Sequence, residues 1–144
     1  MAREIVWEHV RIQVPSGWDA HQGSHWISVF PSECRDLITT QAPVDAVDLQ
    51  VIPGKPEDIE KVVNGLMAPR VPRGEPEAQV TRLAGLPALE RIWMDGVNRI
   101  ASWFVIHRGV IYEIQWSQPL IRATGNAHFG NIGEELCKNG IAFV

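Results

Sequence analysis

The stretch Gly109-Val-Ile-Tyr-Glu-Ile-Gln-Trp116 decides the fold of this chain. Successive side chains of a β-strand point to opposite faces, so this stretch separates into an apolar face and a polar face. The apolar face holds Val110, Tyr112, Ile114 and Trp116, and the polar face holds Glu113, Gln115 and Ser117. This alternation is typical of an antiparallel sheet with one covered face.

The preceding stretch, residues 97–106, has apolar side chains on both faces. One face carries Ile100, Phe104 and Ile106, and the other carries Val97, Ala101, Trp103 and Val105. A strand of this kind must be covered on both sides. The fold class that we predict is therefore α/β of the α+β type, a three-layer α/β/α sandwich with a largely antiparallel central sheet. In it, Tyr112 and Trp116 belong to the core.

Further strands are indicated by β-branched and aromatic residues between Gly, Pro and Asp turn signals. The predicted ranges are 5–14 with a bend near Glu8 and His9, then 26–30, 37–41, 47–52, 79–83, 88–94, 100–107 and 110–117. The dipeptides Asp95-Gly96 and Arg108-Gly109 favour tight turns, so the last strands form successive hairpins. An extended tail at 141–144 is also expected.

Two helices are predicted to cover the two faces of this sheet. The first, residues 56–68, has Pro56 in its first turn and is stopped by Pro69. The second, residues 127–138, is capped by Asn126, and its two glycines permit close packing on the sheet. The apolar stripes are Ile59, Val62, Val63, Leu66 and Met67 in the first helix, and Phe129, Ile132, Leu136 and Cys137 in the second.

Length and composition indicate one globular domain, residues 1–144. The 144 residues include 45% hydrophobic and 21% charged residues, and no internal repeat or second composition is present. The net charge of -4 arises from 13 basic and 17 acidic residues, with the basic ones scattered singly. This pattern excludes nucleic acid as a main partner. We expect no membrane insertion and a cytoplasmic location, because no signal core or long apolar span is present.

No motif in the chain predicts a catalytic residue, a metal or a cofactor. His21 and His25 lie four residues apart, but in a polar, Gly-containing segment without further ligands. Cys34 and Cys137 lack the spacing of a metal site, and we interpret both as reduced, partly buried thiols. The segment Gly125-Asn-Ala-His-Phe-Gly130 lacks the Lys-Ser/Thr ending of a phosphate-binding loop. The sequence therefore favours a non-enzymatic role and leaves enzymatic activity undecided.

Several segments together resemble the PsbP/Mog-type superfamily, including its bacterial families of unknown function. They are Val14-Pro-Ser-Gly-Trp18, the strand entry Gly85-Leu-Pro-Ala88, the strand start Gly109-Val-Ile-Tyr112 and the late helix with Phe129-x-x-Ile132. The resemblance spans nearly the whole chain and implies an α/β/α sandwich. It implies mostly non-catalytic roles: photosystem accessory subunits, small-GTPase binding factors, or chaperones that shield apolar helices of secreted effectors.

We therefore expect a non-catalytic protein-interaction or scaffold module. It binds another protein, or a second copy of itself as a homodimer, through an exposed strand edge or an apolar sheet face. Among six tryptophans, Trp18 and Trp26 near strand ends are the candidate partner anchors. Trp93, Trp103 and Trp116 on consecutive strands are expected to pack across the sheet.

Two alternative functions remain open. The first is a small-ligand-binding protein or enzyme with a pocket between the sheet and the C-terminal helix, lined by His107, Tyr112, Trp116 and His128. The second is a cytoplasmic chaperone for an apolar helix of a secreted effector, which requires a concave apolar surface.

Overall fold

The structure is a computed structural model of the chain, and it describes residues 3–37, 44–71, 77–120 and 128–144. Ten strands, two α-helices and two short 3-10 helices (η1 and η2) follow one another in these ranges. In chain order they are β1 (Arg3–Trp7), β2 (Val10–Val14), β3 (Trp18–Gln22), β4 (Trp26–Pro31), η1 (Ser32–Leu37), β5 (Ala46–Ile52), η2 (Pro56–Asp58), α1 (Ile59–Arg70), β6 (Glu77–Leu83), β7 (Leu86–Asp95), β8 (Asn98–His107), β9 (Val110–Pro119), α2 (His128–Asn139) and β10 (Ile141–Phe143).

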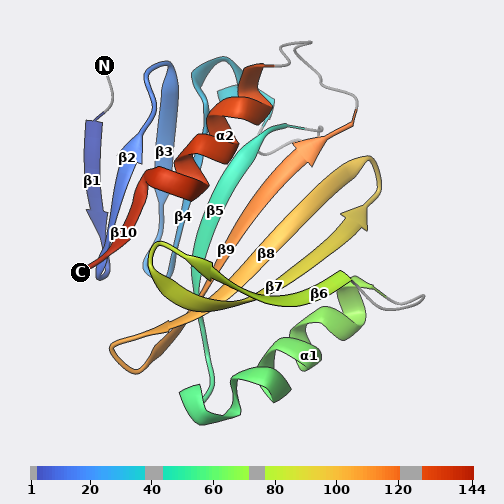
Figure 1. Cartoon of the computed structure of the whole chain (residues 1–144). Coiled ribbons are helices and arrows are strands. Elements are labelled where there is room, and N and C mark those ends of the chain that lie inside the picture. The colour runs from blue at the N-terminus through green and yellow to red at the C-terminus, as the bar shows by residue number, and fades with distance from the viewer. Residues whose placement is uncertain (1–2, 38–43, 72–76, 121–127) are drawn as a thin grey trace.

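Most strands form one antiparallel sheet of seven strands in the order β3-β4-β5-β9-β8-β7-β6 (Figure 1). The stretch with which the sequence analysis began is β9, the central strand. Its Ile114 lies opposite Leu49 of β5 on one side and Trp103 of β8 on the other. The remaining strands form a separate three-stranded sheet in the order β1-β2-β10. The prediction of a mostly antiparallel α+β fold is confirmed.

One face of the large sheet, here called the first face, packs against α2 and the three-stranded sheet. The ring of Trp7 in β1 lies edge-on to Tyr112 of β9 at 6.1 Å between centroids, and Trp18 of β3 packs in the same way on Phe129 of α2. In Figure 1, α2 crosses this face in front of β4 and β5. A Cβ on Gly133 of α2 would come within 2.7 Å of Trp116 Nε1, which confirms that this glycine permits close packing.

The opposite face, here called the second face, carries α1. Val63 and Met67 of α1 are buried against Phe104 of β8, with Leu89 and Trp93 of β7 around them. Phe104 is next to Trp103, which belongs to the core of the first face, so the two neighbours point to opposite sides of β8. The prediction that β8 has apolar neighbours on both faces is therefore confirmed.

The N-terminal third differs from its prediction in two places. Residues 5–14 form a hairpin of β1 and β2 rather than one bent strand, with Glu8 at a φ of 52° in the two-residue turn. The segment from Asp19 to Gln22, which is absent from the predicted strands because its side chains are polar, belongs to strand β3. Because β3 is an edge strand, its outer side chains need not be apolar.

The later elements agree with their predictions within a few residues. Pro69, expected to stop the first helix, lies inside the last turn of α1. The predicted strand at 37–41 and the cap at Asn126 lie outside the described residues, apart from Leu37 at the end of η1. In the described segments, Cys34 and Cys137 are buried and form no disulfide, and no helix has the length and hydropathy needed to span a membrane.

Candidate functional site

A bidentate ion pair divides the second face of the sheet into a covered half and an open half. Arg70, at the end of α1, reaches down to Glu113 in the middle of β9. Beyond it, over β7 and β8, the apolar side chains of α1 cover the sheet. On the other side, over β4 and β5, the polar side chains of the sheet line an open cavity. One candidate site lies in the open half, beside Glu113, and the other lies beyond α1 at the edge of the covered half.

Glu113 is fully buried, and its carboxylate accepts hydrogen bonds from three neighbouring side chains. Arg70 donates through Nη1 to Oε2 at 2.5 Å and through Nη2 to Oε1 at 3.0 Å. The amide nitrogens of Gln50 and Gln115 donate to the same carboxylate at 2.8 and 2.9 Å. The guanidinium of Arg70 also lies 5.6 Å from the ring centroid of Trp93, a cation–π contact. The Glu113 carboxylate thus fixes the side chains of Arg70, Gln50 and Gln115 in the middle of the second face.

These contacts determine the charge state of Glu113. Burial raises the pKa of its carboxyl, but the hydrogen bonds and charge of Arg70, together with the two glutamine amides, lower the pKa below its ordinary value overall. An ionised carboxylate accepts hydrogen bonds and cannot donate them. Glu113 therefore acts as an anchor for its neighbours rather than as a proton donor.

A cavity of about 270 Å³ opens next to this anchor, between β4, β5 and β9. It is lined by Trp26, Ile27, Asp48, Leu49, Gln50 and Gln115. The Asp48 carboxyl accepts a hydrogen bond from Ser28, and burial, with a contribution from the charge of Glu113, raises its pKa to about 6. We call this space the polar cavity.

The wall of the polar cavity formed by Trp26 is fixed by its neighbours. Trp26 is 42% exposed, and its ring lies 5.5 Å from that of His21 in the adjacent strand β3. A Cβ on Gly23 would collide with the indole nitrogen and come within 2.7 Å of Cε2, so only glycine leaves room for this ring position. The short turn between β3 and β4 therefore holds the exposed indole in place.

A second cavity of about 240 Å³ lies beyond α1, at the edge of the sheet. Its lining is apolar, from Ile59, Val80, Pro87, Ala88, Leu89, Phe104 and Ile106. Val80 is 76% exposed and belongs to β6, the last strand of the large sheet. We call this space the apolar cavity. The apolar cavity therefore extends from the exposed edge strand β6 to apolar side chains on the second face of the sheet.

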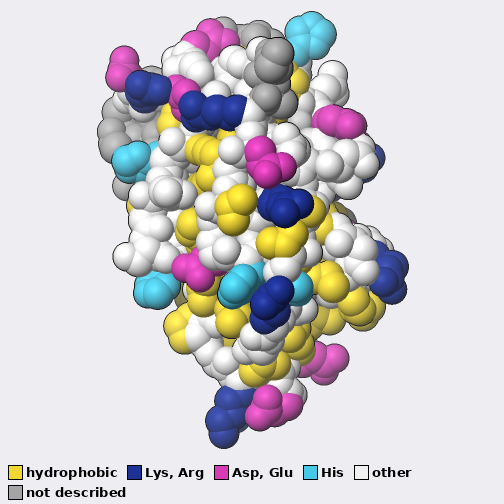
Figure 2. Space-filling model, turned by 90° about the vertical axis from the view of Figure 1, so that its left-hand side faces the viewer, with side chains coloured by type: hydrophobic (Ala, Val, Ile, Leu, Met, Phe, Trp, Pro, Cys, Tyr) yellow, Lys and Arg dark blue, Asp and Glu magenta, His cyan; other side chains and the backbone are white. Residues whose placement is uncertain are grey.

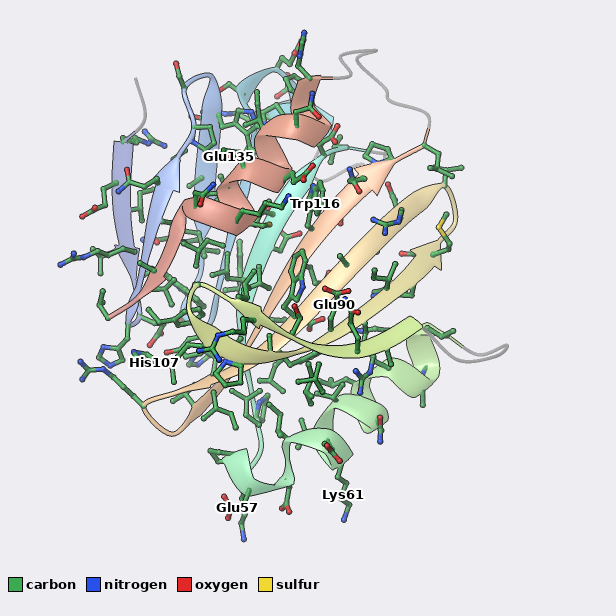
Figure 3. All side chains as sticks on the ribbon, viewed as in Figure 1. Glu57, Lys61, Glu90, His107, Trp116 and Glu135 are labelled. Carbon is green, nitrogen blue, oxygen red and sulfur yellow. The ribbon has the colours of Figure 1, made fainter. Side chains whose placement is uncertain are left out.

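The structure does not bring the four predicted ligand-binding residues together. Tyr112 is buried in the core of the first face, where Trp7 and Phe143 pack on its ring. Trp116 lies under α2, whereas His107 lies toward the opposite end of the sheet (Figure 3), where its Nε2 contacts the carbonyl oxygen of Val144 at 2.8 Å. His128 is exposed at the start of α2.

The two predicted partner anchors differ in their environments. Trp18 is 4% exposed and packs on Phe129, so its ring belongs to the core. Trp26 is exposed and lines the polar cavity. His25 is exposed, and within the described segments no three metal-binding side chains cluster. On the side of β1 and the C-terminus, acidic, basic and hydrophobic side chains are interspersed (Figure 2).

The expectation that Trp93 packs with Trp103 and Trp116 across the sheet is wrong. Trp93 lies on the second face, where its indole nitrogen donates to Ser102 at 3.3 Å. Trp103 is on the first face and donates to Glu90 at 2.8 Å, and Trp116 is on the same face. The registers of β7, β8 and β9 decide this, because Trp93 pairs with Ile100 and not with Trp103.

Of the side chains that line the polar cavity, sequence reasoning picked out Trp26 as a site residue and missed the polar ones. Asp48, Gln50 and Gln115 alternate with apolar residues in their strands, so they look like solvent-facing positions of a one-sided sheet. Arg70 is separated from Glu113 by 43 positions, and only the packing of α1 brings the two together. The apolar residues of β8 on the same face as Glu113 were the one signal that this face is partly buried.

The architecture is similar to that of solved structures with a PsbP-like α+β fold. The solution structure of cyanobacterial PsbP (CyanoP) from Synechocystis sp. PCC 6803 is similar, with a TM-score of 0.56, 10% sequence identity, and coverage of 100% of this chain and 92% of that chain. A crystal structure of a protein from Bacteroides thetaiotaomicron VPI-5482 at 1.50 Å resolution gives a TM-score of 0.54 at 9% identity.

The match to the Bacteroides protein covers 94% of this chain and 45% of that chain, so this chain spans less than half the length of that relative. No family model matches the sequence, and no curated protein matches it either. At these identities the likeness concerns the fold, and it confirms the PsbP part of the predicted resemblance.

Proposed function

We propose that this chain is a non-catalytic protein-interaction module that binds an extended segment of another protein at β6. The single observation that carries the proposal is the exposed Val80 on an edge strand, directly beside the apolar cavity. An added strand would hydrogen-bond to the outer edge of β6, and one of its apolar side chains would enter the cavity.

The composition of β6 supports this use of the edge. Proteins usually protect edge strands with Lys, Pro, bulges or a covering element, because an open edge invites pairing with other chains. The central residues Gln79-Val80-Thr81 contain none of these, and in the described part of the chain no other strand pairs with the outer side of β6. The exposed apolar side chain at the middle of the strand is the reverse of a protected edge.

The proposal also includes a three-layer arrangement of the fold and a place in the wider PsbP/Mog-type group. Phe104 packs under α1 on one face and Trp103 in the core of the other, which supports a three-layer α/β/α sandwich with the small sheet added beside α2. The likeness to cyanobacterial PsbP supports a place in the wider PsbP/Mog-type group. A cytoplasmic location remains a prediction from the sequence.

The test compares the partner captured by the wild-type chain with that captured by Val80→Asp and by Val6→Asp. Val6 is 58% exposed in β1 of the small sheet, so Val6→Asp makes the same chemical change on another edge and is the matched control. We expect Val80→Asp to lose the partner and Val6→Asp to retain it.

Hydrogen exchange on the purified complex locates the contact. We expect partner binding to slow amide exchange in β6, because the added strand pairs with its edge. If the partner is a second copy, light scattering will show a dimer for the wild type and a monomer for Val80→Asp. Equal capture by both variants, or protection confined to another element, would contradict the proposal.

A further inference from the structure

The polar cavity offers hydrogen-bond acceptors, and its lining in the described part of the chain contains no Lys or Arg. Glu113 only accepts hydrogen bonds, so the amide nitrogens of Gln50 and Gln115 must turn toward it, as they do at 2.8 and 2.9 Å. Their carbonyl oxygens therefore point away from Glu113, beside the cavity that both residues line. The Asp48 carboxylate adds two more acceptor oxygens. Ser28 donates one hydrogen bond to this carboxylate, which leaves further acceptor capacity.

Asp48 has no cation to balance it among the described residues. Arg70, the basic side chain that reaches this region, is held by both oxygens of Glu113. Arg91 also faces this side of the sheet, but the two strands β9 and β8 lie between its strand and that of Asp48, so the two positions are three strand spacings apart, roughly 14 Å. The cavity therefore contains a carboxylate without an ion-pair partner.

The remaining wall is aromatic and held in a fixed position. The indole of Trp26 lines the cavity, while Gly23 and the ring of His21 support it from the turn and from β3. The face of an indole attracts cations, and a planar cation can stack on it. Trp26, Asp48, Gln50 and Gln115 thus line one space of about 270 Å³.

We propose that the polar cavity binds a guanidinium group, carried either by a small organic molecule or by an arginine side chain of a peptide. A guanidinium is planar, carries a permanent positive charge and presents five N–H donors. It stacks on Trp26, pairs with Asp48 and donates to the carbonyl oxygens of Gln50 and Gln115. The polar cavity is lined by residues of β4, β5 and β9, whereas β6 lies at the opposite edge of the same sheet. This site is therefore separate from the proposed docking edge.

The test is a titration of the wild-type chain with butylguanidinium, followed by calorimetry and by NMR of the side-chain amides. Butylurea, which has nearly the same shape without the charge, and butylammonium, which is charged but not planar, are titrated in parallel. We expect butylguanidinium to shift the side-chain NH₂ signals of Gln50 and Gln115 and the indole NH signal of Trp26. Butylurea should bind at least about tenfold more weakly, as expected for the loss of a charged hydrogen-bonded pair.

Three variants separate the site from a general effect of charge. Asp48→Asn keeps the shape and removes the charge, and Gly23→Ala displaces the indole without deleting it. Asp95→Asn, at the exposed turn between β7 and β8, changes the net charge by the same amount and is the matched control. We expect about tenfold weaker binding for the first two variants and unchanged binding for the third. Circular dichroism verifies that each variant is folded.

A blocked Ala-Arg-Ala peptide distinguishes the two sources of the group. Tighter binding of the peptide than of butylguanidinium indicates a protein segment, and equal or weaker binding indicates a small molecule; both results support the proposal. The proposal is overturned if Asp48→Asn binds butylguanidinium as tightly as the wild type does. It is also overturned if butylurea or butylammonium binds as tightly as butylguanidinium. The third contradicting result is that no signal shifts at about 20 mM butylguanidinium, a concentration well above a millimolar Kd.

Discussion

At the scale of single residues, Asp48 and Glu113 show how one sheet face treats two carboxyl groups differently. Glu113 is buried, but Arg70 and two amides keep it ionised. The carboxyl of Asp48 accepts a hydrogen bond from the hydroxyl of Ser28, but burial dominates and raises its pKa to about 6. The difference arises from the neighbours each strand position receives and not from the residue types.

Asp48 should make the stability of the fold depend on pH. Its pKa is about 6 in the folded chain against an ordinary value of 3.8, so folding favours the protonated form. Stability is therefore greatest below pH 4 as far as this group is concerned, and it falls as the pH rises through 6. Asp48→Asn cannot ionise and should be more stable than the wild type at pH 8, by about 1 to 3 kcal/mol for a partly exposed group.

Urea unfolding at pH 4.5 and pH 8 measures this effect. The free energies of unfolding of the wild type and Asp48→Asn should differ at pH 4.5 by about a third of their difference at pH 8, because the unfolded Asp48 is already largely ionised at pH 4.5. His21 and Asp19 from β3, Glu113 from β9 and Arg70 from α1 face the same region and are unchanged in both proteins. A difference of the same size at both pH values would show that the charge of Asp48 is not its cause.

At the scale of elements, the two helices use glycine in opposite ways. Gly133 of α2 lies against Trp116, and a Cβ there would come within 2.7 Å of the indole nitrogen. Gly65 of α1 is exposed, and a Cβ would have no atom within 4 Å. The same residue type is therefore required for packing in one helix and only weakens the other.

Gly133→Ala and Gly65→Ala should change stability in opposite directions. Gly65→Ala should stabilise the chain by about 0.5 to 1 kcal/mol, because alanine favours the helix and meets no neighbour. Gly133→Ala has the same helical gain but must move Trp116, so we expect a net loss of about 1 to 2 kcal/mol. Thermal unfolding monitored by circular dichroism compares the two; a gain in both would mean that the α2 packing adjusts freely.

At the scale of the whole molecule, one core joins both sheets and α2. Trp7 from the small sheet packs on Tyr112 of the large one, and Trp18 of the large sheet packs on Phe129 of α2. α1 forms a smaller cluster on the second face, tied to the sheet by Phe104 and by Arg70. These contacts leave no obvious boundary at which the described part of the chain would separate into two units.

We therefore expect the chain to unfold in one cooperative transition, as a single domain would. Near-ultraviolet circular dichroism reports the packing of the tryptophans in both sheets, and the far-ultraviolet signal reports the strands and helices. The two signals should give the same midpoint in urea. If they give two midpoints, the small sheet or α1 unfolds separately and the single-domain prediction is wrong.

The local sequence determined most of the elements. Alternation in β9, apolar residues on both faces of β8 and helical spacing in α1 and α2 each depend on residues within one element, so they could be read without tertiary structure. The same patterns were enough to predict a largely antiparallel α+β fold, whereas the PsbP-like type was implied only by the resemblance of several segments to that superfamily. They failed at β3, where an edge position permits the polar side chains that otherwise indicate a loop.

Only the tertiary structure decided where the candidate sites lie. Which strand neighbours β9, which face receives α1 and how far Arg70 reaches are properties of the assembled sheet, and no spacing along the chain encodes them. The sequence by itself thus determined that β9 is a core strand with an apolar and a polar face. The fold decided that its polar face, through Glu113 and Gln115, is a buried anchor beside a cavity instead of a surface exposed to water.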